Sequence, residues 1–172
     1  MSVDELVKKL QAEQEYRPTA VAVIYRGEGD SREYLILKTS NSEIDPDDPF
    51  PDTWLLLQGG IKPGETYQEG LYREIFEESG IDEKELKLEK IMEPSEVIYK
   101  DFSEEKLPIS GIYTKGKAYI VSYLEYIGEG NLKLNGENSE AVWVSKDKAI
   151  ELFRLGEPKK AEELVGYISM EA

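Results

Sequence analysis

Residues 59–81 read GGIKPGETYQEGLYREIFEESGI and are the most informative part of the sequence. Its first part is rich in glycine and proline and is expected to form a loop. Thr66 and, three positions later, Glu69 make a capping-box pattern, so a helix should begin near Tyr67. Gly80 is the residue type that ends helices, and it marks the expected end of this one.

The predicted helix has two contrasting faces, because successive residues turn by about 100°. The apolar face carries Leu71, Tyr72, Ile75, Phe76 and Ser79. The opposite face carries Gly70, Glu74, Glu77 and Glu78. We expect the first face to pack on a core and the second to be acidic.

The acidic face is unfavourable for the helix itself. Each pair of neighbouring carboxylates costs about 0.2–0.5 kcal/mol. Gly70 costs about 1 kcal/mol relative to alanine and is expected to leave open space above the backbone, enough for a metal-bound phosphate. Carboxylate and carbonyl oxygens are the ligands that Mg²⁺ or Mn²⁺ prefers, and Arg73 can hold Glu77 in place one turn later. The alternative is a solvated, glutamate-rich surface.

Composition narrows the chemistry further. The 172 residues fit one domain, and they contain neither cysteine nor histidine, which excludes disulfides, cysteine nucleophiles and imidazole bases. Acid–base chemistry should therefore use carboxylates. The net charge of −15 is a poor surface for following a nucleic-acid backbone, and no apolar run is long enough to span a bilayer. We expect a cytoplasmic protein with neither a membrane nor a DNA partner, acting as a monomer or homodimer.

Hydrophobic periodicity predicts the remaining elements. Helices are expected at residues 3–14, 145–155 and 159–168, and strands at 19–25, 34–37, 53–57, 86–99 (broken at Pro94), 117–127 and 141–144. Residues 41–52, 104–111 and 128–139 should be irregular. Strands and helices mix without strict alternation, which indicates an α/β fold with a mixed sheet and helices on its faces. We expect a helical extension over 1–15 and the main domain over 16–172.

The stretch at 59–81 resembles the Nudix box. Its pattern runs from Gly59 through Glu65 to Arg73-Glu74, then Glu77-Glu78, and closes on Gly80 and an apolar residue. Every defining position is filled. The resemblance implies a Nudix-type α/β/α sandwich and a hydrolase that uses divalent cations to cleave a nucleoside diphosphate linked to another group.

The same resemblance implies roles for individual residues. Metal ligands would be Gly59, through its carbonyl oxygen, together with Glu74, Glu77 and Glu78. Arg73 would orient these carboxylates and Glu65 would fix the loop to the helix. The catalytic base would be Glu74 or Glu137, with an ordinary loop glutamate as the alternative for Glu137. A bound Mg²⁺ or Mn²⁺ would acidify water and screen phosphate charge.

Segments outside the box resemble the branch that contains dinucleoside polyphosphate hydrolases and RNA pyrophosphohydrolases. They are Tyr16-Arg17-Pro18, TWLLLQGGI at 53–61, a tyrosine eighteen residues past the box, and a basic segment that opens a strand. The substrate-binding residues implied or suggested are Arg17, Lys38, Tyr99, Lys115 and Lys117. Each has a plain alternative as a surface or core residue. Tyr113 or Phe102 could stack on a base.

The leading hypothesis is hydrolysis of diadenosine polyphosphates, such as diadenosine tetraphosphate to ATP and AMP. Removal of pyrophosphate from an RNA 5′ end is the first alternative, against which the acidic charge argues. Hydrolysis of ADP-ribose or of nucleoside triphosphates is less favoured. For ADP-ribose the reason is Val97, which occupies the place where ADP-ribose hydrolases carry proline. A nucleotide-sensing module without turnover is the alternative of another class, but such modules usually lose carboxylates of the box.

Overall fold

The computed structural model describes residues 1–40, 47, 49–50, 52–102, 111–130, 132–133 and 140–170. Its α-helices are α1 (Val3–Glu13), α2 (Tyr67–Ser79), α4 (Lys146–Phe153) and α5 (Pro158–Ser169). Its strands are β1 (Tyr16–Arg26), β2 (Glu33–Ser40), β3 (Asp52–Leu55), β4 (Leu57–Gly60), β5 (Leu86–Ile91), β6 (Ile98–Asp101), β7 (Gly116–Tyr126) and β8 (Glu140–Val144). Short 3₁₀ turns lie at Gly29–Ser31, Glu83–Glu85 and Pro94–Glu96.

These strands form one mixed sheet that divides around β1. The order is β3-β2-β1-β7-β5, while β4 pairs with β1, β6 with β7 and β8 with β2. The β1–β7 pair is parallel and the other pairs are antiparallel. β1 pairs with β4 over residues 19–22 and with β2 at 25–26, so its two halves serve different neighbours.

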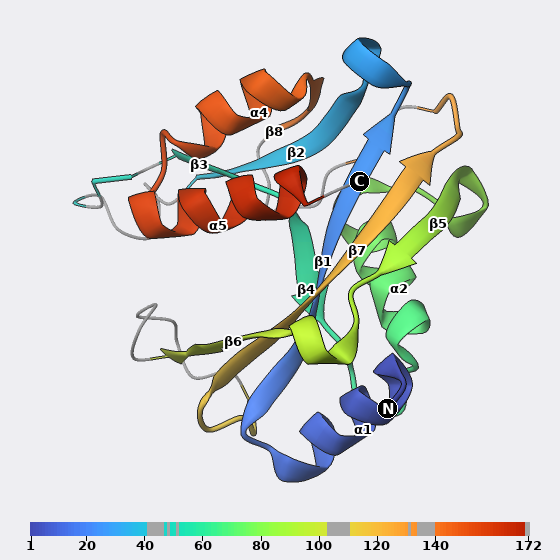
Figure 1. Cartoon of the computed structure of the whole chain (residues 1–172), viewed down its shortest axis with the longest axis vertical. Coiled ribbons are helices and arrows are strands. Elements are labelled where there is room, and N and C mark those ends of the chain that lie inside the picture. Colours follow the sequence, from blue (N-terminus) through green and yellow to red (C-terminus); the bar gives the residue numbers. More distant parts are fainter. Residues whose placement is uncertain are drawn as a thin grey trace.

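Helices cover both faces of this sheet. In Figure 1, α1 and α2 lie on one side of the long strands β1 and β7, and α4 and α5 lie on the other. The hydroxyl of Tyr67 in α2 shares a 2.6 Å hydrogen bond with Ser122 of β7, and the hydroxyl of Tyr123 donates to the carbonyl of Tyr167 in α5 at 3.0 Å. Because consecutive residues of a strand point to opposite faces, the two contacts lie on opposite sides of the sheet. The predicted sandwich is confirmed.

Helix α1 shares the core of the domain. Leu6, Val7 and Leu10 are buried in the same apolar cluster as the sheet. The carboxylate of Asp4 accepts a 2.9 Å hydrogen bond from the backbone N–H of Tyr67, at the start of α2. A negative charge at that position also favours the helix dipole. The division at residue 15 stays a prediction, but the helix itself is packed against α2 and β1.

Most of the predicted elements are confirmed, with one informative difference. The strand expected at 53–57 is two strands, β3 and β4, separated at Leu56. β4 includes Gly59 and Gly60, which were expected in a loop, because they pair with Ala20 and Thr19 of β1. The expected irregular segments at 41–52, 104–111 and 128–139 lie largely outside the described residues. No described helix is both long and apolar enough to cross a membrane.

Candidate active site

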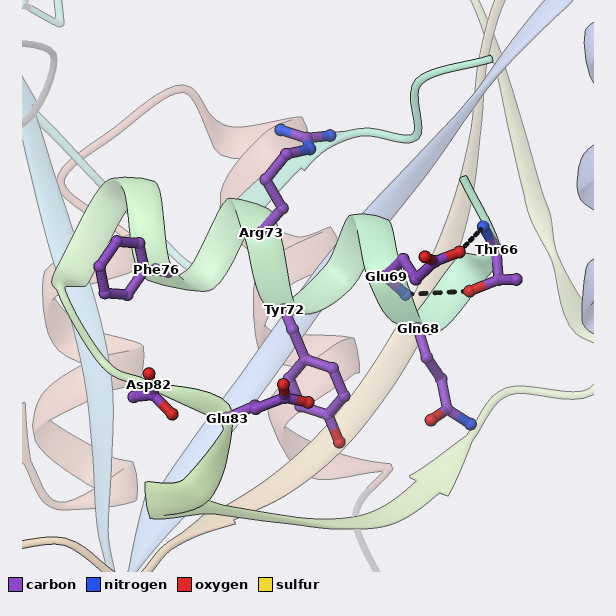
Figure 2. A pocket seen from close by; sticks show the side chains of 8 residues that line it. All are labelled: Thr66, Gln68, Glu69, Tyr72, Arg73, Phe76, Asp82 and Glu83. Carbon is purple, nitrogen blue, oxygen red and sulfur yellow. Dashed lines mark hydrogen bonds between the residues drawn. The ribbon is translucent and has the colours of Figure 1, made fainter. Parts of the chain in front are cut away.

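Helix α2 begins and ends as predicted and positions the site. Thr66 Oγ1 accepts from the backbone N–H of Glu69 at 3.2 Å, and Glu69 Oε1 accepts from the N–H of Thr66 at 2.8 Å, as Figure 2 shows. The helix ends at Gly80, which adopts a left-handed conformation with φ of 76°. These caps satisfy backbone groups that helix ends otherwise leave unpaired, and they fix where the following carboxylates lie.

Arg73 binds three carboxylates and one backbone carbonyl of the site. Its Nε and Nη2 donate to both oxygens of Glu65, at 2.6 and 3.0 Å. Its Nη1 donates to Glu74 at 2.8 Å and Glu77 at 3.1 Å, and Nη2 also donates to the carbonyl of Gly60 at 2.8 Å. A guanidinium has five N–H donors, so these contacts occupy all of them. Arg73 therefore positions other groups.

Two of the three carboxylates that Arg73 contacts, Glu65 and Glu74, have opposite pKa shifts. The hydrogen bonds from Arg73 hold the pKa of Glu65 below its ordinary value, assisted by the N–H of Lys62 at 2.7 Å. Burial raises the pKa of Glu74, whose side chain is 14% exposed, although Arg73 and Arg17 oppose the shift. Glu65 is thus a fixed anion, and Glu74 is a carboxylate that accepts a proton more readily than an exposed one.

Two glycines of β4 make room for charged side chains. A Cβ on Gly59 would lie 2.0 Å from the carboxyl carbon of Glu74. A Cβ on Gly60 would lie 2.2 Å from Nε of Arg17. Real Cβ atoms do not approach other atoms so closely, so only glycine lets the carboxylate and the guanidinium rest against this strand.

Gly70 and Phe76 differ from expectation. Gly70 is buried, and a Cβ there would lie 2.6 Å from Cδ1 of Ile61, so the space above it is filled by the loop before α2. The expected opening for a phosphate at Gly70 is wrong, because the helix packs on Ile61 at that point.

Phe76 was expected on the packed face, yet it is 57% exposed. It lies at the margin of the apolar arc, beyond the part that contacts the sheet.

One cavity gathers most of the predicted site residues. It has a volume of about 330 Å³ and is lined by Arg17, Thr19, Gln58, Gly59, Gly60, Glu74, Glu77, Glu78 and Lys117. The box carboxylates, the glycine of β4 and two predicted phosphate-binding cations therefore lie around one space. Thr19 and Gln58 were not predicted, although the i, i+2 spacing of Thr19 from Arg17 on a strand places both on one face.

Other predicted residues lie elsewhere. Lys38 of β2 contacts Glu140 at 3.8 Å, and Lys115 contacts Glu15 at 3.2 Å. Tyr99 packs edge-on against Tyr16, with ring centroids 5.1 Å apart. Tyr16 and Arg17 are consecutive in a strand and so point to opposite faces of the sheet. Tyr99 is accordingly on the face away from the cavity, and its role stays a prediction, as do those of Lys38 and Lys115.

Glu137 lies outside the described residues. Tyr113 and Phe102 are buried, which leaves little ring surface for a base to stack on. Tyr113 has a different feature that the sequence did not reveal: within the described part of the chain its hydroxyl is buried and has no hydrogen-bond partner. Burial raises the pKa of Tyr113 and the charge of Arg17 opposes the shift, so the two groups interact. An orphaned hydroxyl costs about 1–3 kcal/mol.

A second, wider depression runs along the outer surface of α2. Its volume is about 550 Å³, and Figure 2 shows its lining, with Tyr72, Gln68 and Glu83 on one side of the helix and the guanidinium of Arg73 pointing away from them. Arg73 lines it, but Gly59, Glu74, Glu77 and Glu78 do not. The smaller cavity is therefore the candidate active site.

Comparison with known proteins settles the family. The model of the NUDIX domain matches residues 15–164. The chain belongs to the NUDIX family. NUDIX hydrolases act on phosphoric anhydride bonds and generally use divalent metal ions.

Individual NUDIX relatives are similar over different lengths. An RNA pyrophosphohydrolase from Yersinia enterocolitica is 47% identical over 36 residues, which is 21% of each chain, so this chain spans about a fifth of that relative's length. The Ap4A hydrolase of C. elegans is 19% identical, with a TM-score of 0.58 over 91% of this chain and 99% of that one. E. coli dihydroneopterin triphosphate pyrophosphohydrolase is 19% identical, with a TM-score of 0.59 over 90% and 98%. At these identities the two structures show the fold.

The NUDIX-box residues fit a divalent cation in kind. The glutamates and the backbone of Gly59 that line the cavity present only oxygen donors, as a hard cation requires. Among the described residues, no three acidic side chains are already arranged as a metal site. Arg73 instead holds Glu74 and Glu77, and the Glu77 side chain is 48% exposed.

Proposed function

We propose that this chain is a metal-dependent pyrophosphohydrolase that cleaves a nucleoside diphosphate linked to another group, with diadenosine polyphosphates as its substrates. One observation carries the proposal: a single cavity places the carboxylates Glu74, Glu77 and Glu78 together with the cations Arg17 and Lys117. Carboxylates suit a metal ion and cations suit phosphate oxygens. The combination fits a substrate with several phosphates.

The residues divide the reaction between them. Gly59, Glu74, Glu77 and Glu78 would hold Mg²⁺ or Mn²⁺, which when bound supplies charge screening and acidified water. Glu74 takes a proton from the attacking water, which its burial and raised pKa favour. Glu137 is the second candidate for this base. Arg73, whose donors are all occupied, keeps Glu74 in position, and Arg17 and Lys117 bind phosphate oxygens.

Two features support diadenosine polyphosphates. The first is the basic pair Arg17 and Lys117 beside the carboxylates, which suits a phosphate chain longer than one group. The second is the resemblance of Tyr16-Arg17-Pro18 and of residues 53–61 to the branch that contains the dinucleoside polyphosphate hydrolases. The expected products from diadenosine tetraphosphate are ATP and AMP. Lys38 and Lys115 are proposed to bind more distant parts of the same substrate, whereas the position of Tyr99 on the opposite face of the sheet argues against a direct contact.

Removal of pyrophosphate from the 5′ end of RNA is the second candidate. It is favoured by the local identity with the Yersinia enterocolitica enzyme. The net charge of −15 disfavours binding of an RNA backbone, which needs a basic surface. Hydrolysis of ADP-ribose or nucleoside triphosphates uses the same residues, and a sensing module would bind nucleotide without turnover.

Product analysis tests the proposal. Purified protein with Mg²⁺ is incubated with diadenosine tetraphosphate, 5′-triphosphorylated RNA, ADP-ribose or a nucleoside triphosphate at equal concentration, and the products are separated by ion-exchange chromatography. We expect ATP and AMP from diadenosine tetraphosphate to form fastest, and no turnover with excess chelator. Faster hydrolysis of RNA would favour the second candidate, and activity in chelator would contradict metal dependence.

Matched variants connect the activity to the box. Glu78→Gln and Glu77→Gln remove carboxylates from the cavity, and we expect both to lose turnover while the fold remains intact. Glu93→Gln is the control, because Glu93 is an exposed glutamate that does not line the cavity. Wild-type rates in the box variants would remove these residues from the proposed metal site.

We also propose a cytoplasmic protein that acts as a monomer or homodimer, without a membrane or DNA partner. Light scattering after size-exclusion chromatography measures the mass of the particle. A mass of one or two chains of 19.6 kDa is expected, and a larger assembly would contradict the proposal.

A further inference from the structure

Three basic residues lie side by side across three neighbouring strands. Arg17 of β1 is paired with Lys117 of β7, and Lys117 is paired with Lys100 of β6. Residues paired in this way point to the same face of a sheet, and adjacent strands are about 4.8 Å apart. Arg17, Lys117 and Lys100, named here the basic row, therefore extend about 10 Å across one face. The row starts in the candidate active site, which Arg17 and Lys117 line.

The far end of the basic row is linked to helix α5. Lys100 forms an ion pair with Glu163, and both side chains are only 16% exposed. Figure 1 shows β6 and α5 on the same side of the long strands β1 and β7, where this ion pair joins them. A largely buried ion pair gains little net stability over an apolar contact, because both charges lose water. Stability alone is therefore a weak reason for a lysine and a glutamate here.

Helix α5 brings a further cation to this face. Nζ of Lys160 lies 5.1 Å from the centre of the Tyr119 ring, and Tyr119 is two residues beyond Lys117 on β7. Four cations thus gather around one face of a chain whose net charge is −15. Cationic side chains grouped in this way favour an anionic ligand, and the carboxylates of Glu74, Glu77 and Glu78 lie at the Arg17 end of the row. The Glu163 carboxylate is an anion already bound at this face, through Lys100.

We propose that Lys100 is a phosphate-binding residue that extends the active site along the basic row, and that Glu163 occupies it until the phosphate chain of a substrate takes its place. This inference rests on the proposed function and specifies its substrate class. Substrates with a long phosphate chain reach past Arg17 and Lys117 to Lys100, whereas a diphosphate bound at the carboxylates does not. The site therefore selects polyphosphates by chain length.

Binding of inorganic phosphates to the full chain tests the proposal. Isothermal titration at low ionic strength, with chelator present, compares tripolyphosphate with pyrophosphate. We expect Lys100→Gln to weaken tripolyphosphate binding about tenfold, as loss of one charged hydrogen bond does. Glu163→Gln should tighten it severalfold, since the Glu163 carboxylate no longer competes for Lys100. Glu162→Gln is the matched control: Glu162 is the preceding residue of α5 and pairs with Arg154 at the surface, 3.1 Å away. It should behave as wild type.

Thermal unfolding provides a second readout. Glu163→Gln removes the carboxylate from an ion pair whose side chains are only 16% exposed, so we expect a lower melting temperature without ligand and a larger rise on adding tripolyphosphate than in wild type. The double variant K100Q/E163Q removes both charges and should recover stability but not the enhanced rise. If both single variants bind tripolyphosphate as wild type does, or both bind it more weakly, the ion pair only fastens α5 to β6 and the proposal is overturned.

The outcomes separate this proposal from the proposed function. The titrations use no metal and no turnover, so they do not depend on the box carboxylates acting as a metal site. Hydrolysis of nucleotides with unchanged tripolyphosphate binding in the variants retains the function and rejects the role of Lys100. The expected binding changes without any nucleotide hydrolysis reject the function and leave a polyphosphate-binding row.

Discussion

Two side chains of the active site, those of Glu74 and Arg17, occupy space that neighbouring glycines leave open. Gly59 and Gly60 are consecutive in β4, and their missing Cβ atoms leave the positions that Glu74 and Arg17 occupy. One glycine serves the proposed base and the other serves the proposed phosphate-binding cation. Small changes in the position of either group are costly, because misplacement by about 1 Å lowers rates about a hundredfold.

Substituting these two glycines should have separate kinetic effects. Gly59→Ala displaces the Glu74 carboxylate, and we expect kcat for diadenosine tetraphosphate to fall about a hundredfold. Gly60→Ala displaces the Arg17 guanidinium, and we expect mainly a rise in KM of about tenfold. Both displaced groups are ends of flexible side chains, so circular dichroism should show an intact fold. Equal effects of the two variants on kcat and KM would contradict the separate roles.

Glu65 should make stability depend on acid pH. Its pKa is lowered by Arg73, so its ionised form is favoured in the folded protein. That stabilisation is present above the ordinary pKa of 4.5 and is lost as the pH falls through the lower folded value. We expect Glu65→Gln to cost about 2 kcal/mol at pH 7 and progressively less in acid, measured by urea unfolding between pH 7 and pH 3. A difference that is constant with pH would argue against this pair.

Among the helices, glycine is required by packing in α2 but not in α5. Gly70 in α2 and Gly166 in α5 both lie inside helices, where alanine is intrinsically better by about 1 kcal/mol. A Cβ at Gly70 would press on Ile61, whereas in the described structure a Cβ at Gly166 would meet no atom within 4 Å. Propensity and packing therefore conflict in α2 and agree in α5.

The two alanine variants should change stability in opposite directions. Gly166→Ala should stabilise the protein by about 0.5–1 kcal/mol. Gly70→Ala should destabilise it by about 1–3 kcal/mol, because overpacking outweighs the gain in propensity. Chemical unfolding with equal slopes for both variants measures the difference. Stabilisation by Gly70→Ala would show that the loop before α2 yields easily.

For the molecule as a whole, α1 packs into the same apolar core as the sheet. Leu6 is buried in the cluster that includes the sheet, and Asp4 accepts a hydrogen bond from the start of α2. We expect Leu6→Ala to lower the free energy of unfolding by about 2–5 kcal/mol in a single transition. If residues 1–15 were a separate extension, the main transition would stay where it is. Differential scanning calorimetry distinguishes the two.

Sequence reasoning predicted the helix of the box almost completely. The capping pair Thr66 and Glu69, the end at Gly80 and the run of carboxylates depend on spacings of three or four residues, which a helix converts directly into neighbours. It also predicted the sandwich and the approximate elements. It placed Phe76 wrongly, because an angle around a helix does not say how wide the contact with the sheet is.

Helix α2, its acidic face and the resemblance to the family could therefore be predicted without a structure, since they rest on local hydrogen bonds and periodicity. Strand pairing in the folded chain was needed to show that Gly59 and Gly60 belong to a strand, that Arg17, Lys117 and Lys100 lie in one row, and that Tyr99 lies on the other face. These relations join residues up to a hundred positions apart. They depend on strand pairing and register, where a shift of one residue turns every side chain to the opposite face.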